Sequence, residues 1–569
     1  MTPSTKYLMR SVTPLFMALT TGLACNALAD TPPKLVLQIT VDQLRADLPM
    51  RYLERMPKGG LRYLYDKGTV FTDAHHNHAN TETVVGHATL ATGATPAVHG
   101  MIGNVWFDRD EGRLIYNVED AEFPLLDKNA DVNRKTEIDP TQKKAKSSGR
   151  SPNKIAVSTF SDELVLHTNQ QAKVFAVSVK DRGAITMAGQ SGKAFWFSKK
   201  TGDFVTSRYY YDRYPRWVSQ WNDENLNLKY ANQNWQLLHP VQDYQFKDQD
   251  NQPWEINMPG FGRTFPHAYG KANHPYFNTF LTLSPAGDEL TTSFAERLIL
   301  EEQLGQDNIT DYLSVSYSST DYVGHMFGSA SLEMEDNLLR LDRTLARLLK
   351  TVDKQVGLKN TVIVLSADHG GADSVPYSQK LGMNAHYIAP DAWDTQPAFN
   401  RLKKTFAVGK NIISAYFHPY VYLDRPALEK KGLDVNTVAD AVAKEVSKMP
   451  GVEVAIASHQ IASGNLPDTQ LYRSIINNHN PQRSGDVFVV FEAHSFINDM
   501  DGLKVSAHHG SPWRYDTHVP IVFAGYGIRS QQVNRRVETV DIATTLSILM
   551  GTKLPSGADG NALSEVLPD

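Results

Sequence analysis

The segment that decides the fold is Lys34-Leu-Val-Leu-Gln-Ile-Thr-Val41, a nearly continuous apolar run that ends directly before Asp42. Such a run predicts a strand buried on both faces, as in a parallel sheet. Further runs of this kind lie at 174–179, 312–317, 361–366 and 518–524. Apolar residues with helical spacing lie between them, at 289–303 and 331–356. This alternation predicts a doubly wound, mostly parallel α/β sheet between layers of helices.

Side chains with useful chemistry gather at the ends of these predicted strands. Four of the runs are followed by such a residue, namely Asp42, Lys180, Asp321 and Asp368. Doubly wound sheets bind their ligands beyond the carboxyl ends of the strands. We therefore expect a single site at this edge of the sheet.

Seven residues together predict a site for two adjacent divalent metal ions. Carboxylates, imidazoles and one hydroxyl are the ligands that such ions use in hydrolases. The seven are Asp42, Thr83, Asp321, His325, Asp368, His369 and His509. The spacing of four between Asp321 and His325 brings both side chains to one side of a helical turn. Asp368 and His369 lie in Ser366-Ala-Asp-His-Gly-Gly371, a Gly-flanked turn and the most specific short string of the chain.

Thr83 is the candidate nucleophile. It lies in Thr81-Glu-Thr-Val-Val-Gly-His-Ala-Thr-Leu-Ala-Thr-Gly93, which is predicted to open a helix. The N-terminus of a helix favours anions, so a metal-bound hydroxyl at this point would be aimed at a phosphoryl group. A capping role is the alternative for Thr83, and Thr81 and Thr89 are rivals for the nucleophile within the same segment.

Three further residues are candidates for binding phosphate oxygens. Lys180 and Arg182 lie in Val179-Lys-Asp-Arg-Gly183 after a predicted strand. If the extended conformation persists, a period of two places both cations on one face, where they converge on an anion. A solvated charge cluster is the alternative. Asn104 could donate its amide to the same oxygens, or it is a turn residue after Gly103.

Other histidines compete for the metal roles. Asp73-Ala-His-His-Asn-His78 looks like a metal cluster, but we interpret it as a strand and loop beneath the site. His508 is a rival of its neighbour His509. His518 lies on the following strand and is interpreted as a core histidine or a residue behind the ligands.

Taken together, these residues resemble the alkaline phosphatase superfamily, and most closely the PafA-type phosphate-irrepressible alkaline phosphatases with a threonine nucleophile. The resemblance extends from about Lys34 to the C-terminus and includes the tail at 537–560. It implies an α/β/α sandwich with two Zn²⁺ ions. One ion would be held by Asp42, Asp368, His369 and Thr83, and the other by Asp321, His325 and His509. Asn104, Lys180 and Arg182 match the phosphate-contacting residues of this family.

The resemblance also implies a reaction. Small phosphate monoesters would be hydrolysed by two in-line displacements, in which Thr83 attacks phosphorus and water then hydrolyses the phosphothreonine. Asn104, Lys180 and Arg182 would neutralise the equatorial oxygens, which matters most for a dianionic monoester.

The bulk properties bound the organisation of the chain. Its 569 residues, 41% of them hydrophobic, are enough for one large α/β domain with insertions. Residues 1–29 resemble a secretory signal peptide, which predicts a periplasmic or secreted protein without a transmembrane segment in the mature chain. Residues 30–569 are then the catalytic domain, with insertions at about 195–275 and about 372–500 that cap the site. Cys25, the single cysteine, lies within the predicted signal peptide, where a lipid anchor is an alternative. We expect a monomer, and no basic stripe indicates a nucleic-acid platform.

Three other functions were compared with this prediction. A phosphodiesterase or nucleotide pyrophosphatase shares the six ligands and the threonine, but a diester has one charge fewer and needs less cationic contact than Lys180 and Arg182 offer. A sulfatase requires a Cys or Ser in a C/S-x-P-x-R string, which the Thr83 segment lacks. A non-catalytic metal- or glycan-binding protein is a third alternative, suggested by the aromatic residues of the first insertion.

Overall fold

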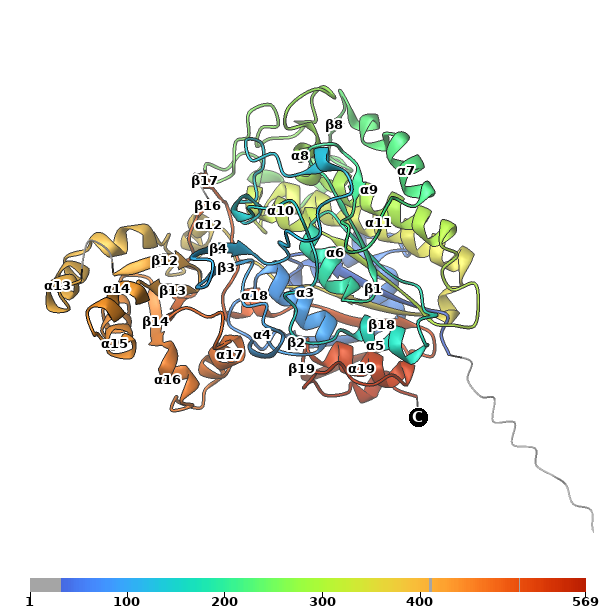
Figure 1. The fold of residues 1–569 in the computed structure, drawn as a ribbon. Coiled ribbons are helices and arrows are strands. Elements are labelled where there is room, and N and C mark those ends of the chain that lie inside the picture. Colours follow the sequence, from blue (N-terminus) through green and yellow to red (C-terminus); the bar gives the residue numbers. More distant parts are fainter. Residues whose placement is uncertain (1–31, 409–411, 501, 569) are drawn as a thin grey trace, which may run out of the picture. The chain divides into compact units, whose positions relative to one another are not determined.

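The structure is a computed structural model that describes residues 32–408, 412–500 and 502–568 (Figure 1). The predicted signal peptide at 1–29, with Cys25, lies outside the described residues. Within the described ranges, no helix combines the length and apolar character needed to cross a bilayer.

A nine-stranded mixed sheet forms the centre of residues 33–568. Its strands are β1 (Leu35–Val41), β2 (Thr69–His75), β5 (Val174–Ser178), β6 (Lys193–Phe197), β7 (Phe204–Val205), β10 (Asp311–Tyr317), β11 (Thr361–Ser366), β18 (Ile521–Gly525) and β19 (Gln531–Glu538). They are ordered β19-β2-β18-β11-β1-β10-β5-β6-β7. All neighbours pair in parallel except β18, which is antiparallel to β2 and β11, and β7, which is antiparallel to β6. The predicted mostly parallel α/β sheet is confirmed.

The antiparallel direction of β18 explains how His509 reaches the site. In its pairing with β11, Val522 lies opposite Leu365. The beginning of β18 therefore lies at the carboxyl edge of the parallel strands. The segment before β18, which contains His509, therefore lies at the same edge as Asp42, although His509 does not follow the end of a strand.

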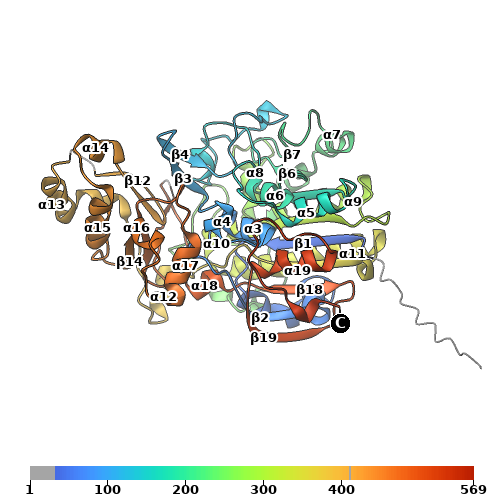
Figure 2. The same cartoon turned by 60° about the horizontal axis from the view of Figure 1, so that its bottom comes forward.

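Helices cover both faces of the sheet, which is why the run in β1 is almost entirely apolar (Figures 1 and 2). Leu35, Leu37 and Ile39 pack in one hydrophobic cluster, whereas Val36 packs in the other. The first cluster includes α1 (Asp47–Tyr52), α2 (Leu61–Lys67), α8 (Phe277–Thr282), α9 (Pro285–Glu301), α10 (Ser319–Phe327) and α11 (Leu332–Gln355). The second includes α3 (Thr83–Thr92), α5 (Phe160–His167), α6 (Asp181–Ala188) and α19 (Asp541–Met550). The two predicted helices, 289–303 and 331–356, correspond to α9 and α11.

Two regions lie largely outside this framework. In the first, β6 and β7 still belong to the central sheet, so the stretch outside it begins after Val205 and not at 195. This stretch contains α7 (Arg216–Asp223), β8 (Asn234–Trp235) and β9 (His267–Ala268). Strands β6 and β7 were not predicted. β6 is short and rich in aromatic residues, so it shows no clear alternation of polar and apolar positions.

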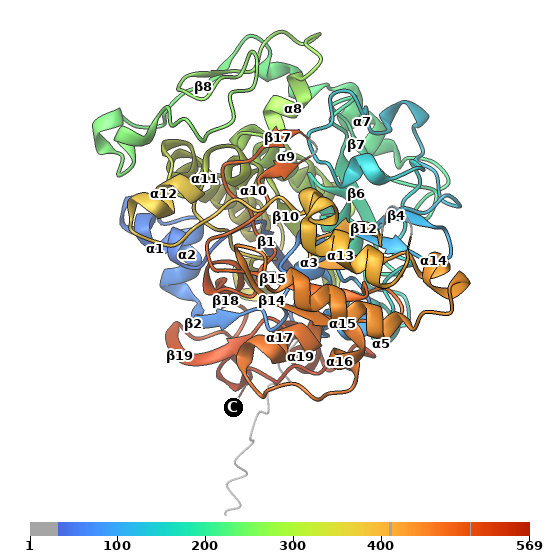
Figure 3. The ribbon, with the colours of Figure 1, turned by 90° about the vertical axis from the view of Figure 1, so that its left-hand side faces the viewer.

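The second region has a sheet and a hydrophobic cluster of its own (Figure 3). Its strands are β12 (Ile413–Phe417), β13 (Tyr420–Leu423), β14 (Val452–Ala457) and β15 (Val487–Phe491), in the antiparallel order β12-β13-β15-β14. Helices α13 (Pro397–Thr405) and α15 (Val435–Val446) pack against these strands.

Candidate active site

The predicted ligands lie at the carboxyl edge of the central sheet. Asp42 directly follows β1, and its N–H donates to the carbonyl oxygen of Tyr317 at the end of β10 (2.9 Å). Asp321 lies in the first turn of α10, so His325 lies one helical turn further on. Asp368 and His369 follow β11 and are fully buried. The edge therefore gathers three carboxylates that are shielded from water.

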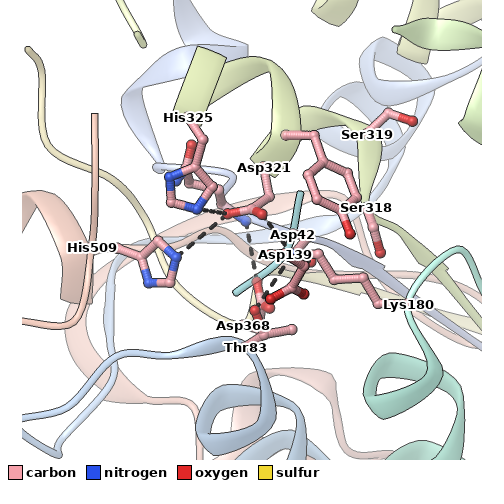
Figure 4. Close-up of polar contacts among 12 residues, drawn as sticks. Asp42, Thr83, Asp139, Lys180, Ser318, Ser319, Asp321, His325, Asp368 and His509 are labelled. Atoms are coloured by element: carbon pink, nitrogen blue, oxygen red, sulfur yellow. Dashed lines mark hydrogen bonds and ion pairs between the residues drawn. The ribbon is translucent and has the colours of Figure 1, made fainter. Parts of the chain in front are cut away.

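The ligands form two adjacent groups, and Figure 4 shows the one in which Asp321 contacts His325 and His509. In the first group, Nε2 of His369 lies 3.4 Å from Oδ1 of Asp42 and 3.5 Å from Oδ2 of Asp368. In the second, Oδ1 of Asp321 lies 3.2 Å from Nε2 of His325 and 3.5 Å from Nε2 of His509. The rings of His369 and His509 stack at 3.6 Å, so the groups adjoin. Apart from Thr83, these are the two sets of ligands that the family resemblance implies for two ions.

The hydrogen bonds of the three histidines fit a metal site. Nδ1 of His325, His369 and His509 lies within 2.8–2.9 Å of a backbone carbonyl oxygen, that of Ala507, Gly370 and Thr81 respectively. A carbonyl oxygen only accepts, so each Nδ1 carries the proton and each Nε2 presents a lone pair. These lone pairs face carboxylate oxygens, an arrangement that a divalent cation between them stabilises.

The chemistry of the donors narrows the choice of ion. Burial lowers the pKa of both His369 and His509, which keeps the imidazoles neutral as metal binding requires. A mixed set of imidazole nitrogens and carboxylate oxygens suits Zn²⁺. The same set is compatible with Mn²⁺ or Fe²⁺.

Thr83 is the first residue of α3, and it is the threonine of its segment that faces the metal-binding groups. Its Oγ1 lies 3.5 Å from Nζ of Lys180. Thr81 instead binds the segment after His509, because its hydroxyl accepts from the N–H of Ser511 (3.0 Å). Thr89 donates inside the helix to the carbonyl oxygen of Val85 (2.9 Å). The contacts thus separate Thr83 from its two rivals.

Lys180 connects the two groups of ligands. It is the N-cap of α6, and its Nζ lies 2.7 Å from Oδ2 of Asp42 and 2.5 Å from Oδ2 of Asp321. Burial alone would lower the pKa of Lys180, but the carboxylates of Asp321 and Asp42 raise it above the usual range. The side chain therefore stays charged and can act as a cation beside Thr83, but not as a base.

The predicted extended conformation of 180–182 is wrong. Only Lys180 is extended, because α6 begins at Asp181 and places Arg182 in its first turn. An acidic residue in the first turn favours this start through the helix dipole. Arg182 nevertheless reaches the same site, since it lines a cavity of about 570 Å³ together with Thr83 and Asn104.

The cavity combines the site with an apolar wall. Its polar lining includes Asp321, His325, His508 and His509. Its apolar lining comes from α10 and from both regions outside the central framework, and includes Ile256, Met326, Ile388, Phe417 and Val505. A substrate could therefore place a charged group against the metal-binding residues and an apolar group against this wall.

Comparison with known proteins agrees with this geometry. Residues 36–513 match the family of type I phosphodiesterases and nucleotide pyrophosphatases. Over 540 residues the chain is 35% identical to alkaline phosphatase PafA of Elizabethkingia meningoseptica, with 94% of each chain covered. A crystal structure of PafA is similar with a TM-score of 0.84 and 33% identity, over 94% of this chain and 99% of that chain. The chain belongs to the alkaline phosphatase superfamily.

The chain is also similar to two further proteins, one named as an alkaline phosphatase and one as an ATPase. The chain is 32% identical to alkaline phosphatase PhoV of Synechococcus elongatus, over 94% of this chain and 93% of that protein. It is also 32% identical to a protein of Myroides odoratus named calcium-transporting ATPase, over 94% of this chain and 95% of that protein. The predicted relationship to PafA-like alkaline phosphatases is confirmed.

Sequence reasoning missed the residues that hold Arg182. Its Nη1 donates to Oδ2 of Asp139 (2.9 Å) and to the hydroxyl of Tyr116 (3.1 Å). Tyr116 lies at the end of β4 (Arg113–Tyr116), and its hydroxyl donates to Oδ1 of Asp181 (2.5 Å). Asp139 lies in an irregular segment, and nothing in the neighbouring sequence marks it as a partner of an arginine 43 positions later.

A second missed residue positions Asn104. The backbone N–H of Asn104 donates to Oε2 of Glu82 (2.5 Å), while its Oδ1 accepts from the N–H of Val84 (3.0 Å). This arrangement leaves the amide nitrogen of Asn104 to donate towards an anion in the cavity. Burial raises the pKa of Glu82 to about 7. In the sequence, only the position of Glu82 directly before Thr83 indicates that it could belong to the site.

The competing histidines take other positions. His75 ends β2, and its ring stacks on that of His518 at 4.8 Å. With Asp73 they form a separate group of possible metal ligands, apart from the seven predicted residues. His87 was missed by sequence reasoning: its Nδ1 lies 3.1 Å from Oδ2 of Asp368. His508 lines the cavity beside His509.

Proposed function

We propose that the protein is an exported, zinc-dependent alkaline phosphatase that hydrolyses phosphate monoesters through a phosphothreonine at Thr83. The observation that carries the proposal is the position of Lys180, whose ammonium lies beside the Thr83 hydroxyl and contacts a carboxylate of each metal-binding group. Arg182 and Asn104 line the same cavity and add donors for phosphate oxygens. This concentration of cationic and amide donors suits a dianionic ester.

The side chains of the site have distinct roles in this reaction. Once its hydroxyl proton has been lost to solvent, Thr83 attacks phosphorus in line with the leaving group, and its position at the start of α3 places the positive end of the helix dipole beside the anion. Lys180 stabilises the negative charge of the deprotonated Thr83 oxygen before it attacks, whereas Arg182 and Asn104 bind the non-bridging oxygens. Water then hydrolyses the phosphothreonine from the side that the leaving group has vacated.

The two groups of ligands define what the ions would supply. Asp42, Asp368, His369 and Thr83 would hold one ion, and Asp321, His325 and His509 the other. When bound, the ions neutralise charge at the attacking and the leaving oxygens of the displacement. The resemblance of residues 1–29 to a signal peptide supports export, and the cavity lining supports a capping role for both inserted regions.

A phosphodiesterase is the second candidate, because the matching family is described by that activity. The two activities differ in how much they depend on cations beyond the metal ions. A diester has one negative charge and a second substituent where a monoester has a free oxygen. The buried ion pair that fixes Arg182 in the cavity favours the monoester.

A substrate panel with the purified, metal-loaded protein tests the proposal. We expect a kcat/KM for p-nitrophenyl phosphate roughly 100-fold or more above that for bis-p-nitrophenyl phosphate, since one oriented donor contributes about that factor. Equal efficiency on both esters would refute the monoesterase assignment.

The Thr83→Ala variant tests the nucleophile. Its activity should fall by roughly three orders of magnitude or more, while Asp42, Asp368 and His369 still bind the ion that Thr83 would help to hold. Thr92→Ala is the matched control, because Thr92 lies in the same helix and its hydroxyl donates to the carbonyl oxygen of Ala88 (2.6 Å). Full activity of Thr83→Ala would eliminate Thr83 as the nucleophile.

A further inference from the structure

His508 lies beside the metal-binding residues but has no role in the function proposed above. Its ring lines the cavity, and its centroid lies 5.4 Å from that of His325 and 5.1 Å from that of His509. One nitrogen of each of these three histidines lies within 4.8 Å of the others. By position alone, His508 could be a further metal ligand.

The hydrogen bonds of His508 assign it a different role. Its Nδ1 accepts the backbone N–H of His509 at 2.8 Å. A neutral imidazole has one proton, so an accepting Nδ1 places that proton on Nε2. His325 and His509 have the opposite tautomer, because their Nδ1 atoms donate to carbonyl oxygens. His508 therefore offers an N–H donor where its two neighbours offer lone pairs.

The place of His508 in the cavity identifies the atom it would contact. In the proposed function Thr83 would bind the ion held by Asp42, Asp368 and His369, so an in-line displacement would direct the leaving oxygen towards the other group. His508 adjoins the two histidines of that other group. Negative charge develops on the leaving oxygen as its bond to phosphorus breaks, and a fixed donor stabilises this charge more in the transition state than in the ground state.

We propose that His508 is a further catalytic residue, whose Nε2–H donates a hydrogen bond to the leaving-group oxygen of the phosphate ester. The proposal rests on the function proposed above. The chemical consequence is a wider substrate class: esters of alcohols that leave poorly, such as alkyl phosphates, depend on this donor. Activated aryl phosphates depend on it less, because their leaving oxygens already disperse the charge.

Two substitutions separate the donor from the structural contact. His508→Asn keeps an acceptor for the N–H of His509 but does not reach the position of Nε2. His508→Gln places an amide N–H near that position. Both are compared with wild type on a series of alkyl and aryl phosphates, with zinc content and thermal unfolding measured in parallel. His459→Gln, a substitution in the second inserted region, serves as the control.

We expect His508→Asn to lower kcat/KM for alkyl phosphates by roughly 10- to 100-fold, and to affect p-nitrophenyl phosphate by much less. His508→Gln should recover most of the loss, and both variants should retain the zinc content of wild type. Loss of zinc would identify His508 as a ligand and overturn the proposal. An equal loss for all leaving groups would also overturn it.

The activity of wild type on monoesters and diesters tests the proposed function separately from the role of His508. If wild type prefers diesters, the monoesterase proposal fails, while the same comparison of alkyl and aryl leaving groups on diesters still tests His508. A wild type that hydrolyses neither class would overturn both proposals.

Discussion

Asp139 is predicted to control the activity by holding Arg182 in place. Asp139 is not one of the predicted metal ligands, so its effect should be exerted through Arg182 alone. Their side chains form a buried ion pair at 2.9 Å and are 5% and 4% exposed, so solvent screens the pair little. Asp139→Asn removes the negative partner and leaves Arg182 with the hydroxyl of Tyr116. Loss of one partner of a buried pair costs about 3–5 kcal/mol, and we expect the lower end because Asn retains an acceptor oxygen.

The effect on activity follows from the orientation of Arg182. A hydrogen bond between a charged donor and a charged acceptor contributes about 1.5–3 kcal/mol. If Asp139→Asn forfeits that contribution at the phosphate, kcat/KM for a monoester falls by roughly 10- to 100-fold. The drop should be much smaller for a diester, which relies less on Arg182.

A double-mutant cycle decides whether Asp139 acts through Arg182. The cycle comprises Asp139→Asn, Arg182→Ala and the double variant, assayed for monoester kcat/KM and for unfolding in urea. Once Arg182 is absent, Asp139→Asn should have little further effect on kcat/KM. Multiplicative losses would refute the reasoning. Glu119→Gln, which breaks the pair between Arg113 and Glu119 outside the cavity, is the control.

Three further predictions concern charge, metal and pH. Arg182→Ala should lower monoester efficiency far more than diester efficiency, and an unchanged ratio would count against its contact with phosphate. Chelation should abolish activity and lower the Tm, both restored by Zn²⁺, since bound ions stabilise the folded state; a chelated protein with full activity contradicts the two-ion site. Burial and the neighbouring Glu333 raise the pKa of Glu255 to about 9. The folded state thus keeps a proton on Glu255 that the unfolded state releases at the ordinary, lower pKa of a glutamate. The resulting contribution to the free energy of unfolding is therefore full at acid pH. It is lost at about 1.4 kcal/mol per pH unit as the pH rises towards about 9. Urea unfolding should show Glu255→Gln to be less sensitive to alkaline pH than wild type, whereas Glu453→Gln at an exposed position should match wild type.

The sheet and the ends of its strands could be predicted because both depend on local pattern. A strand covered on both faces favours a nearly continuous apolar run, and this pattern identified β1, β5, β10 and β11 within one or two residues. The carboxyl edge then placed Asp42, Asp321 and Asp368 together without any knowledge of distances. The direction of β18 is decided by pairing between distant segments, so the sequence did not reveal why His509 reaches that edge.

The conformation of Lys180 and Arg182 was predicted wrongly for a related reason. A period of two describes an extended chain, but α6 begins at Asp181, so Arg182 lies in the first turn of a helix. The partner of Arg182 was also invisible, because Asp139 contacts it across a long stretch of irregular chain. The choice between His508 and His509 required the tautomer of each ring, which only hydrogen bonds to the backbone reveal.

The division of oxygens at two carboxylates connects the metal ions to the choice of substrate. Asp42 and Asp321 each turn Oδ1 towards histidine nitrogens and Oδ2 towards Nζ of Lys180. Lys180 can therefore keep both contacts, and its place beside Thr83, while each Oδ1 binds an ion. Asp42, Asp321 and Asp368 together carry one negative charge more than Lys180 and Arg182 balance. Without divalent ions the site would repel a phosphate dianion, so metal binding and selection of a monoester are expected to depend on each other.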